Sequence, residues 1–321
     1  MISLSPPAAR LDRPLRDMAA WVVYFRDAPI PVLDATAEAV RSYAENEDAV
    51  DAHLLAETVS VDPLMTLSLL AHVGSTSRRA TDVETVTGAL LLLGIGPFFR
   101  RFRNLTSVST QLADLTDAAG ARQGLQAVLE RTQRAARFAL GFAAHRMDPD
   151  AAVIHEAALL HDLAELLLWC HAPLLAMEIA HRLRATPGLR SVQAQQAVLG
   201  IALADLQQAL MKAWRLPELL IQLDDERHAD SPQVRNVALA VRLARHSAEG
   251  WHNPGPAGRP QRDRGPASAR PRAYAQTAAR DRQLTCGLSR PRCIGRGRWL
   301  IVQLRPRATA DHANSNIPVW Q

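Results

Sequence analysis

Apolar positions recur every three or four residues along most of this chain. The pattern holds from about Asp17 to Glu249, and the strict alternation of apolar and polar residues that marks a half-buried strand is almost absent. A spacing of three to four residues places apolar side chains on one face of an α-helix. The sequence therefore predicts an all-α protein, built as a bundle of many helices.

Proline and capping residues mark where several of these helices begin and end. Asp62-Pro63 and Ser231-Pro232 each place a capping side chain before a proline that suits the first helical position. The second of these helices is predicted to run to about Gly250. Further boundaries are predicted at Asp148-Pro149, at Leu216-Pro217, at Thr81 with Glu84 as a capping box, and at Gly94, where the helix that carries Val83 to Leu93 ends.

The periodicity stops at Pro254, and glycine, proline and arginine dominate the C-terminal tail, residues 254–321. Such a composition buries too little apolar surface to offset the entropy of an ordered chain, so we predict a disordered tail. The chain has one lysine, Lys212, against 36 arginines, as a GC-rich gene would encode. A shift of reading frame near codon 254 would give the same composition, and an arginine-rich segment that binds nucleic acid is a third interpretation.

The positive net charge of the chain belongs to this tail. Of the 37 basic and 32 acidic residues, 13 and 3 lie in 254–321, which leaves 24 and 29 for residues 1–253. The tail therefore carries about +10 and the helical part about −5. Basic charge attracts nucleic acids. Because the excess is confined to the tail, a nucleic-acid partner is not expected for the helical part.

The sequence offers no sign of a membrane or secreted protein. It has no apolar run of about 18 residues, and its first residues lack a basic segment followed by an apolar one. Cys170, Cys286 and Cys293 have neither metal-ligand nor disulfide spacing. These features predict a cytoplasmic protein, with Cys170 packed in the core and not acting as a nucleophile.

One adjacent pair carries candidate chemistry. His161 and Asp162 lie in what the pattern predicts to be the middle of an apolar helix over residues 157–168. Imidazole and carboxylate groups can both ligate a divalent metal, which lowers the pKa of a bound water. The alternative is a buried polar pair in which Asp162 accepts hydrogen bonds and orients His161. The other histidines near helix ends, His145, His171 and His181, are expected to be solvated.

A second candidate is the basic cluster Arg100, Arg101 and Arg103, which follows two phenylalanines. Guanidinium groups at this density can bind a phosphorylated partner or a nucleotide phosphate. Arg78 and Arg79, in the preceding loop, would add to it. The alternative is that the cluster forms a solvated helix face.

Six motifs, in order along the chain, resemble those of the HDOD domain, the HD-related output domain of bacterial signalling proteins. They are Ile30 to Leu33, Val61 to Met65 followed by Leu69-Leu70, Ala89 to Gly94, Ala157 to Glu165, Ala213 to Pro217, and Val241 to Trp251. The resemblance covers about 220 residues. It implies an HD-like helical bundle over 21–253, after a leader over 1–20 and before the tail. Within the motifs we expect structural roles for Asp62, Pro63, Gly94, Trp214 and Pro217.

The resemblance also implies which metal ligands are missing. Catalytic HD proteins add an upstream His and a distal Asp to the His-Asp pair. The position of the upstream His falls near Arg131, and that of the distal Asp falls in Val241 to Arg245, where no Asp occurs. Ala164 and Glu165 replace the Gly and Lys that often follow the pair. His161 and Asp162 are therefore interpreted as the remnant of a metal site, and no cofactor is expected.

Two functions remain open. The resemblance implies a regulatory output domain without catalysis, which binds a signalling protein or a small ligand and can dimerise. The alternative is a metal-dependent HD-type phosphohydrolase, acting on a nucleotide or cyclic dinucleotide, which would need ligands beyond His161 and Asp162.

Overall fold

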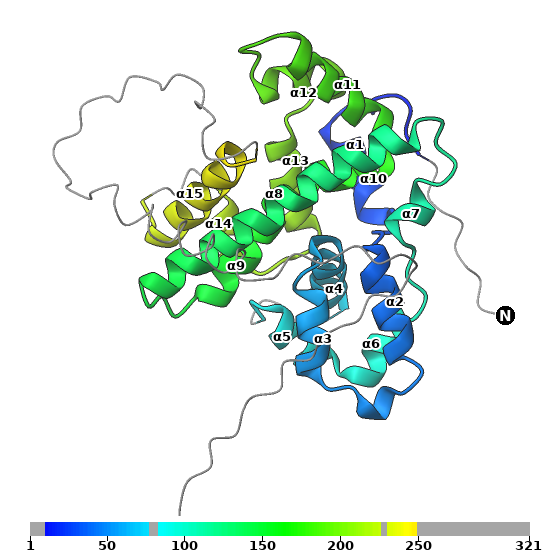
Figure 1. Ribbon diagram of the computed structural model, residues 1–321, viewed down its shortest axis with the longest axis vertical. Helices are drawn as coiled ribbons and strands as arrows, with labels where there is room; N and C mark the ends of the chain where they lie inside the picture. The colour runs from blue at the N-terminus through cyan, green and yellow to red at the C-terminus, as the bar shows by residue number, and fades with distance from the viewer. Residues whose placement is uncertain (1–9, 77–82, 226–229, 249–321) are drawn as a thin grey trace, which may run out of the picture. The chain divides into compact units, whose positions relative to one another are not determined.

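The computed structural model describes residues 10–76, 83–225 and 230–248 (Figure 1). The chain divides into two units, Met1–Asp263 and Arg264–Gln321, and every described residue belongs to the first. The described residues are helical and contain no strand; an isolated parallel bridge joins Val32 to Ser107. The prediction of an all-α fold is confirmed. The predicted tail and the first half of the predicted leader lie outside the described residues.

The helices follow one another with short connections. The first half of the chain forms α1 (Met18–Asp27), α2 (Asp34–Tyr43), the 3-10 helix η1 (Glu47–Ala49), α3 (Ala52–Val59), α4 (Pro63–Thr76), α5 (Val86–Leu93), α6 (Ile95–Phe102), α7 (Val108–Gln111) and α8 (Ala118–His145). The second half forms α9 (Ala151–Leu160), α10 (Leu163–His171), α11 (Pro173–Ala185), α12 (Ser191–Leu199), α13 (Leu203–Ala213), α14 (Glu218–Asp224) and α15 (Pro232–His246).

The Asp62-Pro63 signal acts as predicted and does more than cap a helix. One carboxylate oxygen of Asp62 accepts hydrogen bonds from the backbone N–H groups of Leu64 (2.9 Å) and Met65 (3.1 Å). The other accepts from the N–H of Leu33 (2.8 Å), the residue before α2. Asp62 is fully buried, so its hydrogen bonds replace the water that the carboxylate loses. One side chain thus fixes the start of α4 against the start of α2.

Other boundaries differ from the sequence prediction for local reasons. The side chain that caps α5 belongs to Thr85, which accepts from the N–H of Gly88 at 3.1 Å; Thr81 lies outside the described residues. Asp148 accepts from the N–H of Asp150 at 3.1 Å and forms a turn, so α9 begins only at Ala151. Helix α15 starts at Pro232 as predicted but ends at His246, four residues before Gly250.

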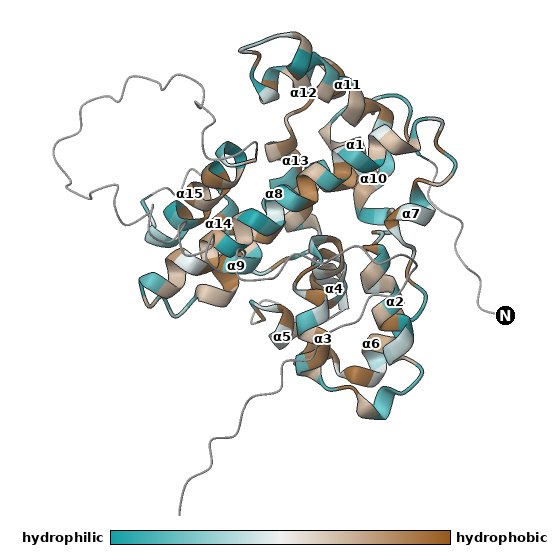
Figure 2. Ribbon diagram, viewed as in Figure 1, coloured by the Kyte–Doolittle hydropathy of each residue, from teal (hydrophilic) through white to brown (hydrophobic). Residues whose placement is uncertain are grey.

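Helix α8 is the central helix of the second half of the fold. It packs along α9 and α15 and also contacts α10 and α11, while α14 lies against α9 and α15. Helix α4 contacts α8, α9 and α10 and so joins the N-terminal helices to this group. Figure 2 shows hydrophobic residues along the faces that the helices turn toward one another. Among the described residues, the largest fully buried side chains include Trp21, Phe25 and Phe98.

Two glycines allow close helix packing. A Cβ atom on Gly74, in α4, would collide with the carbonyl oxygen of Trp214 and lie 2.8 Å from that of Arg215. A Cβ atom on Gly124, in α8, would collide with the indole ring of Trp169. Only glycine leaves the space that these backbone and ring atoms fill.

No single helix among the described residues is long and apolar enough to cross a membrane. The segments Ala151–His171 and Pro173–Ala185 meet that length and hydropathy only as a pair, which is bent by 117°.

Candidate functional site

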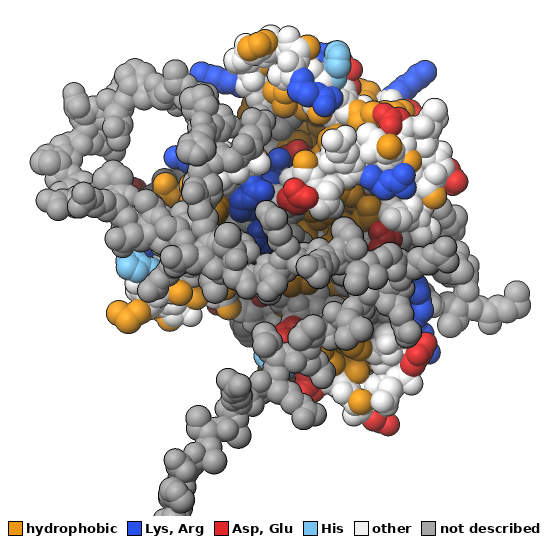
Figure 3. Space-filling view, viewed as in Figure 1, with side chains coloured by type: hydrophobic (Ala, Val, Ile, Leu, Met, Phe, Trp, Pro, Cys, Tyr) orange, Lys and Arg blue, Asp and Glu red, His pale blue; other side chains and the backbone are white. Residues whose placement is uncertain are grey.

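A cleft of about 690 Å³ opens beside the His161-Asp162 pair. Figure 3 shows one face of the molecule, on which basic and acidic side chains lie next to one another between apolar surfaces. The polar floor of the cleft is formed by Arg131, His161, Asp162, Glu165, Asp224 and Arg245. The apolar wall includes Leu168, Trp169, Ile179, Leu183, Val192 and Leu203. A cavity of this size with a few convergent polar groups is typical of a ligand site.

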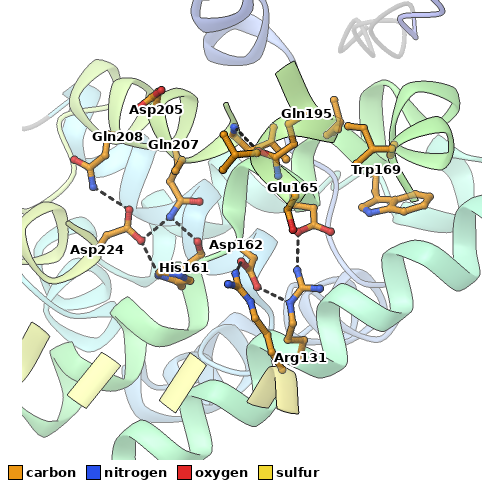
Figure 4. Close-up of a pocket in the computed structure, with 18 of the residues that line it drawn as sticks. Arg131, His161, Asp162, Glu165, Trp169, Gln195, Asp205, Gln207, Gln208 and Asp224 are labelled. Atoms are coloured by element: carbon orange, nitrogen blue, oxygen red, sulfur yellow. Dashed lines mark hydrogen bonds and ion pairs between the residues drawn. The ribbon is translucent and has the colours of Figure 1, made fainter. Parts of the chain in front are cut away.

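His161 and Asp162 lie at a break between two helices, and the predicted single helix over 157–168 is wrong. Helix α9 ends at Leu160 and α10 begins at Leu163. Gln207 of α13 bonds to backbone groups on both sides of the break. Its side-chain nitrogen donates to the carbonyl oxygen of His161 (2.6 Å), and its side-chain oxygen accepts from the N–H of Ala164 (3.3 Å). The break turns both side chains of the pair toward the cleft (Figure 4).

Two arginines hold the carboxylate of Asp162. Arg131 of α8 donates from Nε to Oδ2 at 2.7 Å, and Arg245 of α15 donates from Nη2 to Oδ1 at 2.9 Å. Arg131 also donates from Nη2 to Glu165 at 2.7 Å (Figure 4). Burial alone would raise the pKa of Asp162, but the charges of Arg131 and Arg245 outweigh it and hold that pKa well below its usual range.

His161 is oriented by Asp224, and not by Asp162 as expected from the sequence. Its Nδ1 lies 3.0 Å from Oδ1 of Asp224, at the end of α14. Asp224 also accepts from the side-chain nitrogens of Gln207 (2.6 Å) and Gln208 (2.9 Å). Burial lowers the pKa of His161, but the contact with Asp224 and the charge of Asp162 outweigh it, so the net direction is upward. Asp224 lies 63 residues along the chain from His161, and sequence reasoning missed it.

The residues of the site do not fit a divalent metal. The described part of the chain contains no group of three His, Cys, Asp or Glu side chains placed to hold an ion. Both oxygens of Asp162 already accept hydrogen bonds from guanidinium groups. Arginine stays protonated and has no lone pair to offer a metal. The described side chains around Asp162 therefore do not form a divalent-metal site.

The basic cluster of the sequence lies elsewhere. Arg100 and Arg101 are exposed on α6, and Arg103, directly after it, donates to Glu47 at 3.0 Å. The guanidinium of Arg101 lies 5.4 Å from the ring centre of Phe102. None of the three lines the cleft. Binding of a phosphorylated group by this cluster stays a prediction, and Arg78 and Arg79 lie outside the described residues.

The residues expected to have structural roles lie at helix boundaries. Asp62 and Pro63 begin α4, as described above. Gly94 separates α5 from α6 with a φ of +82°, a conformation that favours glycine. Trp214 is buried directly after α13, and Pro217 directly precedes α14.

One expectation about the remaining histidines is wrong. His171 is fully buried, with its ring against those of Tyr24 and Phe25, and burial lowers its pKa to about 4. It ends α10, whose last residues are all buried, so a position at a helix end does not imply solvation. His145 and His181 are exposed as expected, and Cys170 is buried.

An all-α bundle with a His-Asp pair at a helix break defines an HD-like helical domain. The sequence matches the HDOD domain family over residues 30–229, and the chain therefore belongs to this family. A search of curated proteins found no match.

Solved structures share the fold. The MmoQ response regulator from Methylococcus capsulatus strain Bath is 21% identical, with 69% of this chain and 88% of that chain covered and a TM-score of 0.53. A virulence factor from Campylobacter jejuni is 19% identical, with 74% and 85% covered and a TM-score of 0.54. At these identities the similarity extends to the fold alone.

Proposed function

We propose that this chain is a non-catalytic regulatory domain of bacterial signalling, which works in the cytoplasm and binds a protein partner or a small ligand at the cleft beside Asp162. The cleft is lined by residues of α8, of every helix from α10 to α15 and of the junction between α9 and α10, so binding there can be transmitted through helix packing. MmoQ, which shares this fold, is named as a response regulator, and this is consistent with a signalling role.

The observation that carries this proposal is the pairing of the Asp162 carboxylate with two arginines. A carboxylate that serves a metal must let the cation approach it, and positively charged neighbours oppose that approach. Here each oxygen of Asp162 accepts a short hydrogen bond from a different arginine. The resemblance to HD proteins implies that the upstream His of catalytic members would fall near Arg131 and the distal Asp within Val241 to Arg245. Two guanidinium groups at Asp162 repel a metal ion, and the described residues hold no group of three His, Cys, Asp or Glu side chains that could complement the carboxylate, so the phosphohydrolase alternative is disfavoured.

The first test is enzymatic. The full chain is incubated with bis(p-nitrophenyl) phosphate and with cyclic dinucleotides in the presence of Mn²⁺, Fe²⁺ or Zn²⁺. We expect no hydrolysis above that of a buffer control. Metal-dependent turnover that disappears in His161→Ala would overturn the proposal in favour of a phosphohydrolase.

The second test addresses binding at the cleft. A photo-crosslinking amino acid is placed at Val192, which lines the cleft and is 46% exposed, and as a control at Val23 of α1, which is 50% exposed and does not line it. We expect one defined adduct in cells from position 192 and none of the same mass from position 23. Equal labelling from both positions would contradict binding at the cleft.

A further inference from the structure

The floor of the cleft joins three parts of the fold through one carboxylate. Asp162 lies at the junction of α9 and α10, Arg131 comes from the middle of α8, and Arg245 comes from the last turns of α15. Each arginine binds a different oxygen of Asp162, at 2.7 Å and 2.9 Å. The contact is therefore a bridge between helices that lie far apart in the sequence, with Asp162 as its centre.

The two arginines of the bridge supply the positive charge that compensates the buried carboxylate of Asp162. The side chain of Asp162 is 8% exposed, and an ionised carboxylate removed from water is costly unless it is paired and hydrogen-bonded. Glu165 accepts from Arg131 at 2.7 Å, so a second carboxylate depends on the same guanidinium. The positive charge at this point holds two carboxylates in a partly enclosed site.

We infer that Arg131 and Arg245 together take the place of a metal ion at Asp162, as a cationic bridge built from the chain itself. The bridge satisfies both oxygens of the carboxylate and brings two fixed positive charges to it, which repel a further cation at this distance. The His-Asp pair is thereby kept as a structural joint that works without metal.

The two arms of the bridge differ in exposure. Both arginines line the cleft, but the side chain of Arg131 is 20% exposed and that of Arg245 is 53% exposed. Arg245 is therefore the more accessible of the two to an occupant of the cleft. Arg245 is the arm through which binding reaches α15, and Arg131 is the arm that keeps Asp162 fixed on α8.

The bridge is tested by a double-mutant cycle on the full chain. Asp162→Asn, Arg245→Met and the double variant are unfolded in urea, and the unfolding constants are compared. We expect the two changes to be coupled by about tenfold, because Arg245→Met leaves one oxygen of the buried, ionised Asp162 without its hydrogen bond, a loss that is smaller once Asp162→Asn has removed the charge. Arg137→Met, on the exposed face of α8, is the matched control and is expected to be additive with Asp162→Asn. Additivity of Asp162→Asn and Arg245→Met would overturn the inference.

The replacement of a metal is tested by restoring ligands. In the double variant Arg131→His/Arg245→Asp, the positions of both arms carry groups that can bind a metal. We expect Mn²⁺ or Zn²⁺ to raise its Tm, with reversal by chelator, and to leave the Tm of the unchanged protein where it was. The variant Arg137→His/Arg242→Asp makes the same chemical changes on the same two helices at positions that do not line the cleft, and we expect no response from it.

Two results would contradict this inference. One is a restored variant that folds and shows no response to metal. The other needs no variant: about one equivalent of metal per chain in the unchanged protein, lost in Asp162→Asn, would show that the arginines do not replace an ion. The double-mutant cycle measures the bridge in the absence of any partner. A negative crosslinking result at Val192 would therefore not contradict the bridge, and additivity in the cycle would not contradict binding at the cleft.

Discussion

Glu156 is a buried acid whose protonation the fold controls. It lies on α9 with 4% of its surface exposed, and its Oε1 accepts from the backbone N–H of Val86, the first residue of α5, at 2.8 Å. Its Oε2 is buried and has no hydrogen-bond partner among the described residues. Burial raises the pKa of Glu156 to about 8, although the bond from Val86 opposes this shift. The carboxyl is therefore mostly neutral in the folded protein at pH 7.

This shift makes the free energy of unfolding depend on pH. Below the ordinary pKa of 4.5, Glu156 is protonated in both the folded and the unfolded chain, and there is no penalty. Between about pH 4.5 and 8 only the unfolded chain releases the proton, so stability falls by about 1.4 kcal/mol per pH unit. Across the 2.5 units to pH 7 the loss is about 3 kcal/mol. Above about pH 8 both states are ionised and the loss stops growing.

The variant Glu156→Gln removes this dependence, because an amide does not titrate. Its carbonyl oxygen still accepts from Val86, while its buried NH₂ group adds a cost that is the same at every pH. We therefore expect its stability relative to the unchanged protein to rise by about 3 kcal/mol from pH 4.5 to pH 7. Urea unfolding of both proteins at half-unit intervals of pH measures this slope separately from the constant offset.

Glu178→Gln is the control for this measurement. Glu178 is exposed on α11, and its hydrogen bond from Arg182 lowers its pKa, so its removal is expected to give a small slope of opposite sign. A difference between Glu156→Gln and the unchanged protein that stays constant from pH 4.5 to pH 7 would refute the reasoning. It would mean that Glu156 is ionised in the folded protein.

Three further predictions concern packing. Gly74→Ala should destabilise the protein by about 3 kcal/mol or more in urea unfolding, because the new methyl group meets backbone carbonyls that cannot rotate away. Gly124→Ala should lower the free energy of unfolding by about 1–3 kcal/mol despite the better helix propensity of alanine, because the new methyl group collides with the ring of Trp169. Gly96→Ala is the control for both variants, since its methyl group meets only a flexible arginine at 3.4 Å. A destabilisation equal to that of Gly96→Ala would contradict either prediction. Cys170 should resist thiol reagents in the native state and react on unfolding, since burial raises the pKa of its thiol; the test uses a variant whose other two cysteines are serine, and rapid native labelling would contradict it.

The sequence predicts the parts of the fold whose causes are local. Asp62-Pro63 begins a helix because the aspartate caps it and the proline suits its first turn, and both residues are adjacent in the chain. Helix α15 begins at Pro232 as predicted, although the Ser231 side chain makes no capping hydrogen bond and contacts Gln233 instead, and Leu216-Pro217 separates α13 from α14 as predicted. In each case the signal and the structure that it specifies lie within a few residues.

The site was harder to predict because its causes are distant in the sequence. No glycine or proline lies near His161-Asp162 to indicate a helix break in the sequence. It is accompanied by hydrogen bonds from Gln207, which lies 46 residues away from His161. The expectation that Asp162 orients His161 was wrong for the same reason. The sequence shows that Asp162 is adjacent to His161, but it does not show that Asp224, on another helix, lies beside the imidazole. Periodicity identifies the buried face of a helix and does not identify the polar group that it meets.

The inferred cationic bridge accounts for how Asp162 stays ionised in a buried position. If Arg131 and Arg245 were neutral residues, an ionised Asp162 would be buried without a cationic partner from α8 or α15, at a cost of several kcal/mol. Arg131 and Arg245 instead bring two positive charges to the point where a metal ion would carry the same charge. Both oxygens of the carboxylate are thereby paired, and α8 and α15 are joined to the junction between α9 and α10. In this chain the charge of Asp162 is therefore balanced by side chains of α8 and α15.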